Sequence, residues 1–154
     1  MAASSTDRIE KKILLRAPRA RVWRALADAK EFGTWFGVKL EGTFAPGARI
    51  TGKVLHPDYA HVPFDLTIER MEHERLLSWR APPHPVEKGK DDSNEPSTLV
   101  VFELEDVPGG TMLTVVESGF DGIPLSRRAE AYRGNEEGWT IQMGNIERYV
   151  RQAA

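Results

Sequence analysis

Hydrophobic and polar residues alternate along much of the chain, which is the pattern of half-buried β-strands. The alternation is clearest over residues 62–69, and residues 98–105 and 111–118 form a predicted hairpin across a Pro-Gly-Gly turn. Further strands are predicted at 9–16 and around the apolar pairs Val38 and Leu40, Ile50 and Val54, and Leu77 and Trp79. Turns of two or a few residues between successive strands favour antiparallel strands that are neighbours in the sheet.

Helical spacing replaces this alternation in three places. The first helix is predicted over 18–29 and begins at Pro18, a residue favoured in the first turn of a helix. A second short helix carries Phe32, Trp35 and Phe36. A long helix is predicted over 125–150, with an inward face made of Leu125, Ala129, Tyr132, Glu136, Trp139, Met143, Ile146 and Val150.

Glycine is expected to weaken the long helix near its middle. Gly134 and Gly138 each lower helix stability by up to about 1 kcal/mol relative to alanine. A kink or break near 134–138 is therefore predicted.

The order of elements is a strand, two short helices, six strands and one long helix. No strand–helix–strand alternation is present, so a parallel doubly wound sheet is not expected. A sheet with one apolar face must be covered, and the C-terminal helix is the element long enough to cover it. The prediction is an α+β fold, a curved antiparallel sheet around that helix, in one domain over 8–152 after a disordered tail at 1–7.

Composition narrows the functional classes. The chain has 154 residues and a net charge of −2, which gives no basic field for nucleic acid. The absence of cysteine excludes disulfides, thiolate nucleophiles and cysteine-based zinc sites. No apolar run approaches the roughly 20 residues of a membrane span, and the start lacks the features of a signal peptide. We therefore expect no stable membrane insertion and a cytoplasmic location.

Several short motifs, in order along the chain, resemble a known family. They are Arg16-Ala17-Pro18, Val22 to Leu26, Trp35-Phe36, Leu76 to Arg80, Gly110 to Thr114, Glu117 to Phe120, and Glu137-Gly138-Trp139 with Ile146 and Tyr149. Over roughly residues 8–152 the chain resembles the heat-shock-protein-90 ATPase-activator-homologue proteins of the START and pollen-allergen-like helix-grip superfamily, also known as SRPBCC. The resemblance implies a cavity between the concave sheet and the long helix, with hydrophobic small molecules or lipids as ligands.

A ligand site in that cavity is expected to be mainly apolar with a few polar groups. The candidate ligand-binding residues are Trp35, Phe64, Leu66, Trp79, Arg80, Phe102, Val115, Glu117, Tyr132, Glu136, Trp139 and Met143. Glu117 and Glu136 interrupt apolar faces, so each needs a partner or a raised pKa. In a functional role they would orient a ligand hydroxyl or act as acid and base. The structural alternative is a partner such as Arg80 or Arg133, or a helix break that turns Glu136 outward. The competing interpretation is that the apolar candidates only fill a core.

The sequence gives little support for nucleophilic catalysis, nucleotide binding or a metal site. There is no G-x-S-x-G, G-x-G-x-x-G or P-loop motif. His56 and His61 lie near Asp58, but a metal site needs a firmer constellation, and we predict no metal and no cofactor. His73 and His84 are read as loop residues. Arginine and glutamate interleave along the last helix as on a solvated face.

The function predicted is the binding of a hydrophobic small molecule or lipid. Access to the cavity is expected to be gated by residues 32–37, 82–97 and 119–124. One alternative is a cyclase or dehydratase acting on a polyketide-like substrate, with an acid–base pair drawn from Glu117, Glu136 or His61. Another is a co-chaperone-like modulator of a heat-shock ATPase, with a chaperone as partner.

Overall fold

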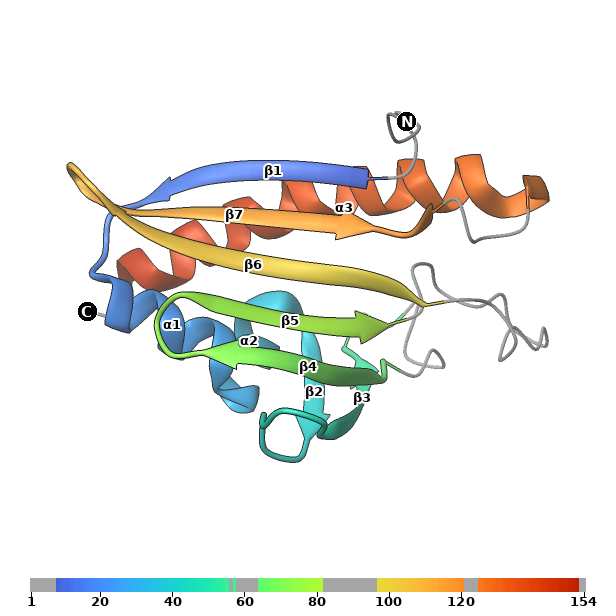
Figure 1. Cartoon of the computed structure of the whole chain (residues 1–154), viewed down its shortest axis with the longest axis horizontal. Helices are drawn as coiled ribbons and strands as arrows, with labels where there is room; N and C mark the ends of the chain where they lie inside the picture. The colour runs from blue at the N-terminus through green and yellow to red at the C-terminus, as the bar shows by residue number, and fades with distance from the viewer. Residues whose placement is uncertain (1–7, 56, 58–63, 82–96, 121–124, 153–154) are drawn as a thin grey trace.

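Seven strands and three helices make up the fold in the computed structural model (Figure 1), which describes residues 8–55, 57, 64–81, 97–120 and 125–152. In chain order they are β1 (Arg8–Leu15), α1 (Arg19–Ala27), α2 (Ala29–Phe36), β2 (Val38–Glu41), β3 (Arg49–Val54), β4 (Leu66–Glu72), β5 (Leu76–Ala81), β6 (Thr98–Val107), β7 (Gly110–Ser118) and α3 (Leu125–Gln152). This order confirms the predicted succession of elements. The predicted N-terminal tail, residues 1–7, lies outside the described residues.

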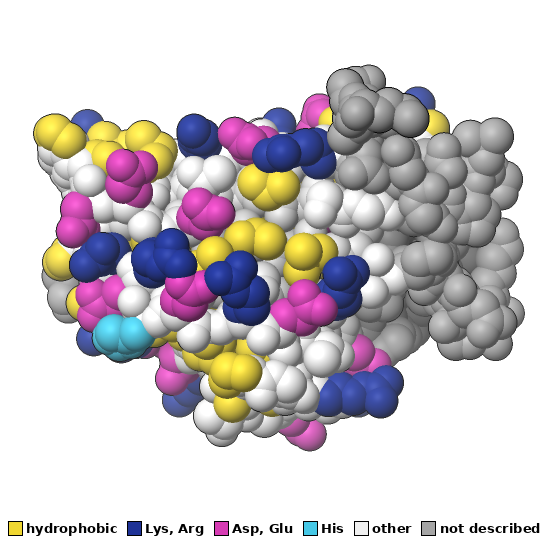
Figure 2. Space-filling model, viewed as in Figure 1, with side chains coloured by type: hydrophobic (Ala, Val, Ile, Leu, Met, Phe, Trp, Pro, Cys, Tyr) yellow, Lys and Arg dark blue, Asp and Glu magenta, His cyan; other side chains and the backbone are white. Residues whose placement is uncertain are grey.

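All seven strands form one antiparallel sheet in the order β1-β7-β6-β5-β4-β3-β2. α3 runs along one face of the sheet behind β1 and β7 (Figure 1), while α1 and α2 connect the two edge strands. On the face turned away from α3, acidic and basic side chains interleave with small apolar patches (Figure 2). The α+β class predicted from the sequence is confirmed.

The predicted hairpin is present as β6 and β7, which pair from Leu99 with Ser118 to Val107 with Gly110. The strand predicted at 62–69 differs from β4, which begins at Leu66 and continues to Glu72. Residues 62 and 63 lie outside the described part of the chain. A register shift between Ile68 and Arg70 interrupts the pairing with β5. Such a bulge adds one residue to the strand, so the simple alternation ends there.

α3 is one continuous helix of 28 residues, so the predicted break near 134–138 is wrong. Its inward stripe also differs from the prediction, because Asn135 is half-buried and Glu136 is exposed. These two residues flank the stripe on opposite sides. The side chain of Asn135 hydrogen-bonds to Glu117 of β7, which turns the Asn135 side of the helix toward the sheet.

A cluster of ionic and aromatic groups joins the three helices near the C-terminal end of α3. The Glu31 carboxylate accepts hydrogen bonds from Arg21 at 2.8 Å and from the Tyr149 hydroxyl at 2.9 Å, and pairs with Arg24 at 3.2 Å. The Arg21 guanidinium also lies 5.0 Å from the centre of the Tyr149 ring. α1, α2 and α3 are therefore held together at this end of the sheet.

Two glycine substitutions are expected to act in opposite directions. A Cβ at Gly52 would lie 2.5 Å from the Lys39 carbonyl oxygen and 3.2 Å from that of Phe64, so β2 or β3 would have to move. Gly52→Ala should lower the free energy of unfolding by about 1–3 kcal/mol. Gly138→Ala meets nothing within 4 Å and should raise it by up to about 1 kcal/mol, because alanine favours helix. Urea unfolding of both variants tests this, and equal effects would contradict it.

Candidate functional site

The carboxyl group of Glu117 lies in the interior between the sheet and α3. Glu117 is the penultimate residue of β7, and only 3% of it is exposed. The indole Nε1 of Trp139 donates to its carboxylate at 2.7 Å, and the Asn135 amide donates to both oxygens at 2.9 Å. The hydroxyl of Thr98 on β6 is the third donor residue and also hydrogen-bonds to the carboxylate. This buried group therefore links two strands to the long helix.

The environment of Glu117 acts on its pKa in two directions. Burial removes solvent from the charged form and raises the pKa above the ordinary value of 4.5. Hydrogen bonds from Thr98, Trp139 and Asn135 stabilise the charged form and lower the pKa, but burial has the larger effect. Among the described residues, no basic side chain contributes to this balance.

Trp79 lies in the same cross-strand row as Glu117. The row consists of Ile68, Trp79, Val100, Glu117 and Ile9, all buried, on β4, β5, β6, β7 and β1. β6 alone separates the strands of Trp79 and Glu117, so at ~4.8 Å per strand their backbones are roughly 10 Å apart. The Nε1 atom of Trp79 is buried and has no hydrogen-bond partner in the described part of the chain.

Aromatic rings occupy most of the remaining interior at this level. The rings in contact are those of Phe32, Trp35, Phe36, Phe64, Trp79, Phe102 and Trp139. Phe102 lies between Trp79 and Trp139, and the centre of its ring is 5.9 Å from that of Trp79 and 5.7 Å from that of Trp139. Most pairs are edge-to-face or tilted, the arrangements that the ring quadrupole favours. The sheet, α2 and α3 thus share one aromatic cluster.

Most of the sequence-predicted site residues come together in this interior. Those that are buried or packed against the core are Trp35, Phe64, Leu66, Trp79, Phe102, Val115, Glu117, Tyr132, Trp139 and Met143. Two of them use their polar atoms for structure, since the Trp35 indole donates to the Ala25 carbonyl at 2.8 Å and the Tyr132 hydroxyl to the Arg8 carbonyl at 3.1 Å.

Arg80 and Glu136 were expected to point inward, and for both this placement is wrong. Arg80 is exposed and its Nε donates to Glu69 at 2.8 Å. It follows Trp79 on β5, and neighbouring residues on a strand face opposite sides. Glu136 is exposed on α3. The partners expected for Glu117 were arginines, whereas the structure supplies a hydroxyl, an amide and an indole.

Thr98 and Asn135 are polar residues of this site that were not predicted from the sequence. The spacing of four residues between Asn135 and Trp139 places both on one helix face, which was an available signal. His56, Asp58, His61 and His84 lie outside the described residues, as do 82–96 and 121–124 of the predicted gating segments. In the part of the chain that the structure describes, no three acidic or histidine side chains gather as a metal site would require.

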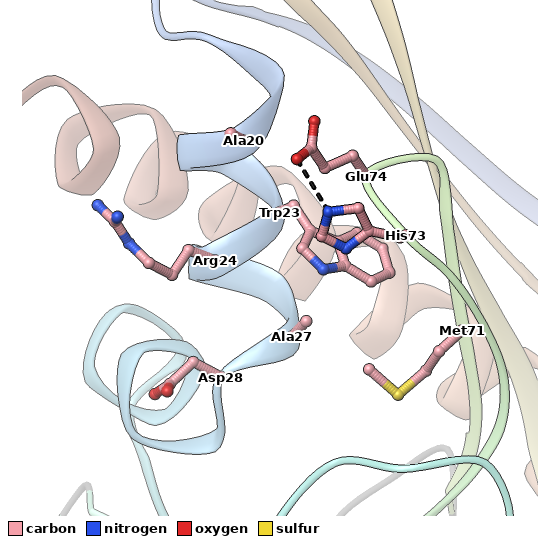
Figure 3. Close-up of a pocket in the computed structure, with 8 residues that line it drawn as sticks. All are labelled: Ala20, Trp23, Arg24, Ala27, Asp28, Met71, His73 and Glu74. Carbon is pink, nitrogen blue, oxygen red and sulfur yellow. Dashed lines mark ion pairs between the residues drawn. The ribbon is translucent and has the colours of Figure 1, made fainter.

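A surface groove lies apart from this interior, between α1 and the turn joining β4 to β5 (Figure 3). Its volume is about 400 Å³, and its lining is Ala20, Trp23, Arg24, Ala27, Asp28, Met71, His73 and Glu74. His73 pairs with Glu74 at 3.0 Å and contacts the edge of the Trp23 ring. The His73 side chain is 79% exposed, so the groove is open to solvent. None of the predicted ligand-binding residues lines it.

A curved antiparallel sheet closed over by one long C-terminal helix, with a buried polar cluster between them, defines a protein of the helix-grip class. Residues 16–151 match the family described as Activator of Hsp90 ATPase homolog 1-like protein. The chain belongs to this family, as the sequence motifs predicted. No curated protein sequence matches the chain significantly.

Solved structures share the whole fold. MLL2253 from Mesorhizobium loti is 20% identical, with a TM-score of 0.76 over 96% of this chain and 98% of that one. NE0264 from Nitrosomonas europaea is also 20% identical, with a TM-score of 0.74 over 97% of each chain. DynU16, a protein in the dynemicin biosynthetic locus, is 26% identical, with a TM-score of 0.70. This chain is covered to 95% in that match but spans only 48% of DynU16. Across the described residues, no helix is long and apolar enough to span a bilayer.

The titration of Glu117 predicts how stability depends on pH. Because folding raises its pKa above 4.5, the folded protein holds this proton more tightly, and ionisation above pH 4.5 lowers the free energy of unfolding. Glu117→Gln removes the titration. The stability of the wild type relative to Glu117→Gln should therefore fall as pH rises from about 4.5 through the folded-state pKa, with a slope approaching about 1.4 kcal/mol per pH unit, and then level off.

Urea unfolding of the wild type and Glu117→Gln across pH 4–8 measures this difference. If the wild type instead becomes more stable relative to Glu117→Gln as the pH rises, the hydrogen bonds outweigh burial and the prediction is wrong.

Proposed function

We propose that this protein binds a hydrophobic small molecule or lipid between the concave face of the sheet and α3. The observation that carries the proposal is the interior itself, where a cluster of aromatic rings surrounds a small number of convergent polar groups at Glu117. Ligand sites of small molecules have this composition. Burying about 300 Å² of apolar ligand surface would contribute about 7 kcal/mol before the costs of ordering are subtracted.

The absence of a side chain at Gly138 leaves space for a ligand to approach along one side of α3. Gly138 lies on the half-buried strip that also carries Asn135 and Gln142, and a Cβ at Gly138 would meet nothing within 4 Å. The Gln142 amide donates to the Phe36 carbonyl at 2.8 Å, which places this strip beside the aromatic cluster. A ligand entering past Gly138 would reach the rings of Phe36 and Trp139, whose centres are 6.0 Å apart.

The surface groove beside α1 supports ligand binding less well than the interior. A molecule in the groove would keep much of its surface in water, because the groove is open and His73 on its rim is largely exposed. Apolar affinity grows with the area removed from water, so the interior is the better site.

Among the residues that the structure describes, no arrangement of side chains supports either alternative function. An acid–base pair of Glu117 and Glu136 is not assembled, since Glu117 is buried and Glu136 is exposed. His61 lies outside the described residues. Modulation of an Hsp90 ATPase rests on the description of the family alone.

Titration of ¹⁵N-labelled protein with N-phenyl-1-naphthylamine and with 1-hexadecanol tests the proposal. We expect chemical-shift changes for at least one of them at the backbone amides of Phe102 and Trp139, together with saturable binding. Gly138→Leu, whose side chain would grow into the open flank, should weaken binding about tenfold, because it occupies the approach to the site.

Ile141→Ala is the matched control, since Ile141 is 63% exposed on the same helix, and its affinity should equal that of the wild type. The proposal fails if neither probe shifts any residue of the interior, or if the two variants weaken binding equally.

A further inference from the structure

Trp79 differs from Trp35 and Trp139, the other tryptophans of the aromatic cluster, in the hydrogen bonding of its indole N–H group. The indole of Trp35 donates to a backbone carbonyl and that of Trp139 donates to Glu117. Nε1 of Trp79 is buried without an acceptor among the described residues, and the rings packed around the indole belong to Phe32, Phe64 and Phe102. A buried donor without an acceptor is costly, so an oxygen brought by a ligand would recover the lost hydrogen bond.

The other buried polar groups on this face already have partners. Both oxygens of Glu117 accept hydrogen bonds from Asn135, and one oxygen each also accepts from Trp139 and Thr98. A carboxylate has about four acceptor sites, which these contacts use. Glu117 therefore holds the site in shape, and the N–H of Trp79 is the buried donor on the described part of this face that remains open for recognition.

The charges in the interior favour an uncharged ligand. Glu117 and Arg21 are the buried charged residues among those described, and Arg21 is committed to Glu31 at the far end of α3. Arg80, the cation expected to meet an acidic head group, is exposed and paired with Glu69. A fatty-acid carboxylate placed here would meet the like charge of Glu117 without a described cation to offset it.

The aromatic rings that line the interior favour a flat ligand. The rings of Phe64, Trp79, Phe102 and Trp139 are packed mostly edge-to-face or tilted, and such walls accept another ring in the same geometries. Phe64 is half-buried and lies ahead of β4 rather than within it, whereas Phe32 and Phe102 are fully buried. The centre of the Phe64 ring lies 6.3 Å from that of Trp79, so displacement of this half-buried ring would uncover one side of the indole.

Building on the proposed function, we infer that the ligand is an uncharged planar aromatic molecule with a carbonyl-type oxygen that accepts a hydrogen bond from Nε1 of Trp79. Glu117, Asn135 and Trp139 form the fixed polar wall of the site, and the displaced Phe64 ring packs against the bound rings.

Three probes separate this inference from general apolar binding. 9-Fluorenone is planar and carries a carbonyl oxygen, fluorene has the same ring skeleton without it, and 1-hexadecanol is an uncharged alkyl chain. We expect 9-fluorenone to bind about five- to tenfold more tightly than fluorene, the effect of one hydrogen bond to a buried donor. The indole N–H resonance of Trp79, assigned with Trp79→Phe, should move downfield with 9-fluorenone and not with fluorene.

Trp79→Phe keeps an aromatic ring and removes the N–H donor. In this variant the ratio of the two affinities should approach one, so the preference for 9-fluorenone over fluorene disappears whatever the affinity for fluorene itself. β-(3-Benzothienyl)alanine at position 79, which keeps the shape of the indole, should give the same loss if Trp79→Phe disturbs the fold.

The remaining outcomes overturn one proposal or both. Equal binding of 9-fluorenone and fluorene to the wild type would exclude recognition through Trp79. Binding of 1-hexadecanol alone would refute the aromatic ligand class and leave the proposed function intact. If none of the three probes binds, the proposed function and the ligand class are both refuted.

Discussion

The buried carboxylate of Glu117 is the constraint on which the arrangement of the interior depends. Removing a carboxylate from water is expensive, and here donors from β6 and from two successive turns of α3 offset part of the cost. An apolar side chain at this position would avoid the desolvation cost, but its contacts would not select one rotation of α3 about its axis. The directional hydrogen bonds from Asn135 and Trp139 do select one. That rotation places Trp139 and Met143 against the sheet and Glu136 in solvent.

The second anchor of α3 is the ionic cluster around Glu31 at the other end of the helix. Glu117 holds the middle of α3 through Asn135 and Trp139, and Glu31 holds its C-terminal part through Tyr149. The helix is continuous through Gly134 and Gly138. Between the two anchors the aromatic rings pack against each other and against the sheet. The interior therefore combines a hydrogen-bonded polar wall at Glu117 with a buried donor at Trp79 that has no acceptor among the described residues.

The sequence predicted the fold well because the alternation of strands and the 3.6-residue stripe of the last helix are local patterns. It identified Glu117 as a buried carboxylate needing a partner, but not which partner, because the donors come from β6 and α3 and their distances depend on tertiary packing. The rotation of α3 was missed for the same reason, since positions 135 and 136 are equally acceptable as the edge of an apolar stripe. The early end of the alternation at the β4 bulge, and the continuity of a helix containing two glycines, are likewise effects of long-range contacts.

The claim that Glu117 anchors α3 is tested most directly by a double-mutant cycle between Glu117 and Trp139. The free energy of unfolding is measured by urea for the wild type, Glu117→Leu, Trp139→Phe and the double variant. A hydrogen bond from the buried indole to the carboxylate predicts a coupling energy of about 1.5–3 kcal/mol. Additive effects of the two substitutions, with a coupling energy near zero, would contradict the account.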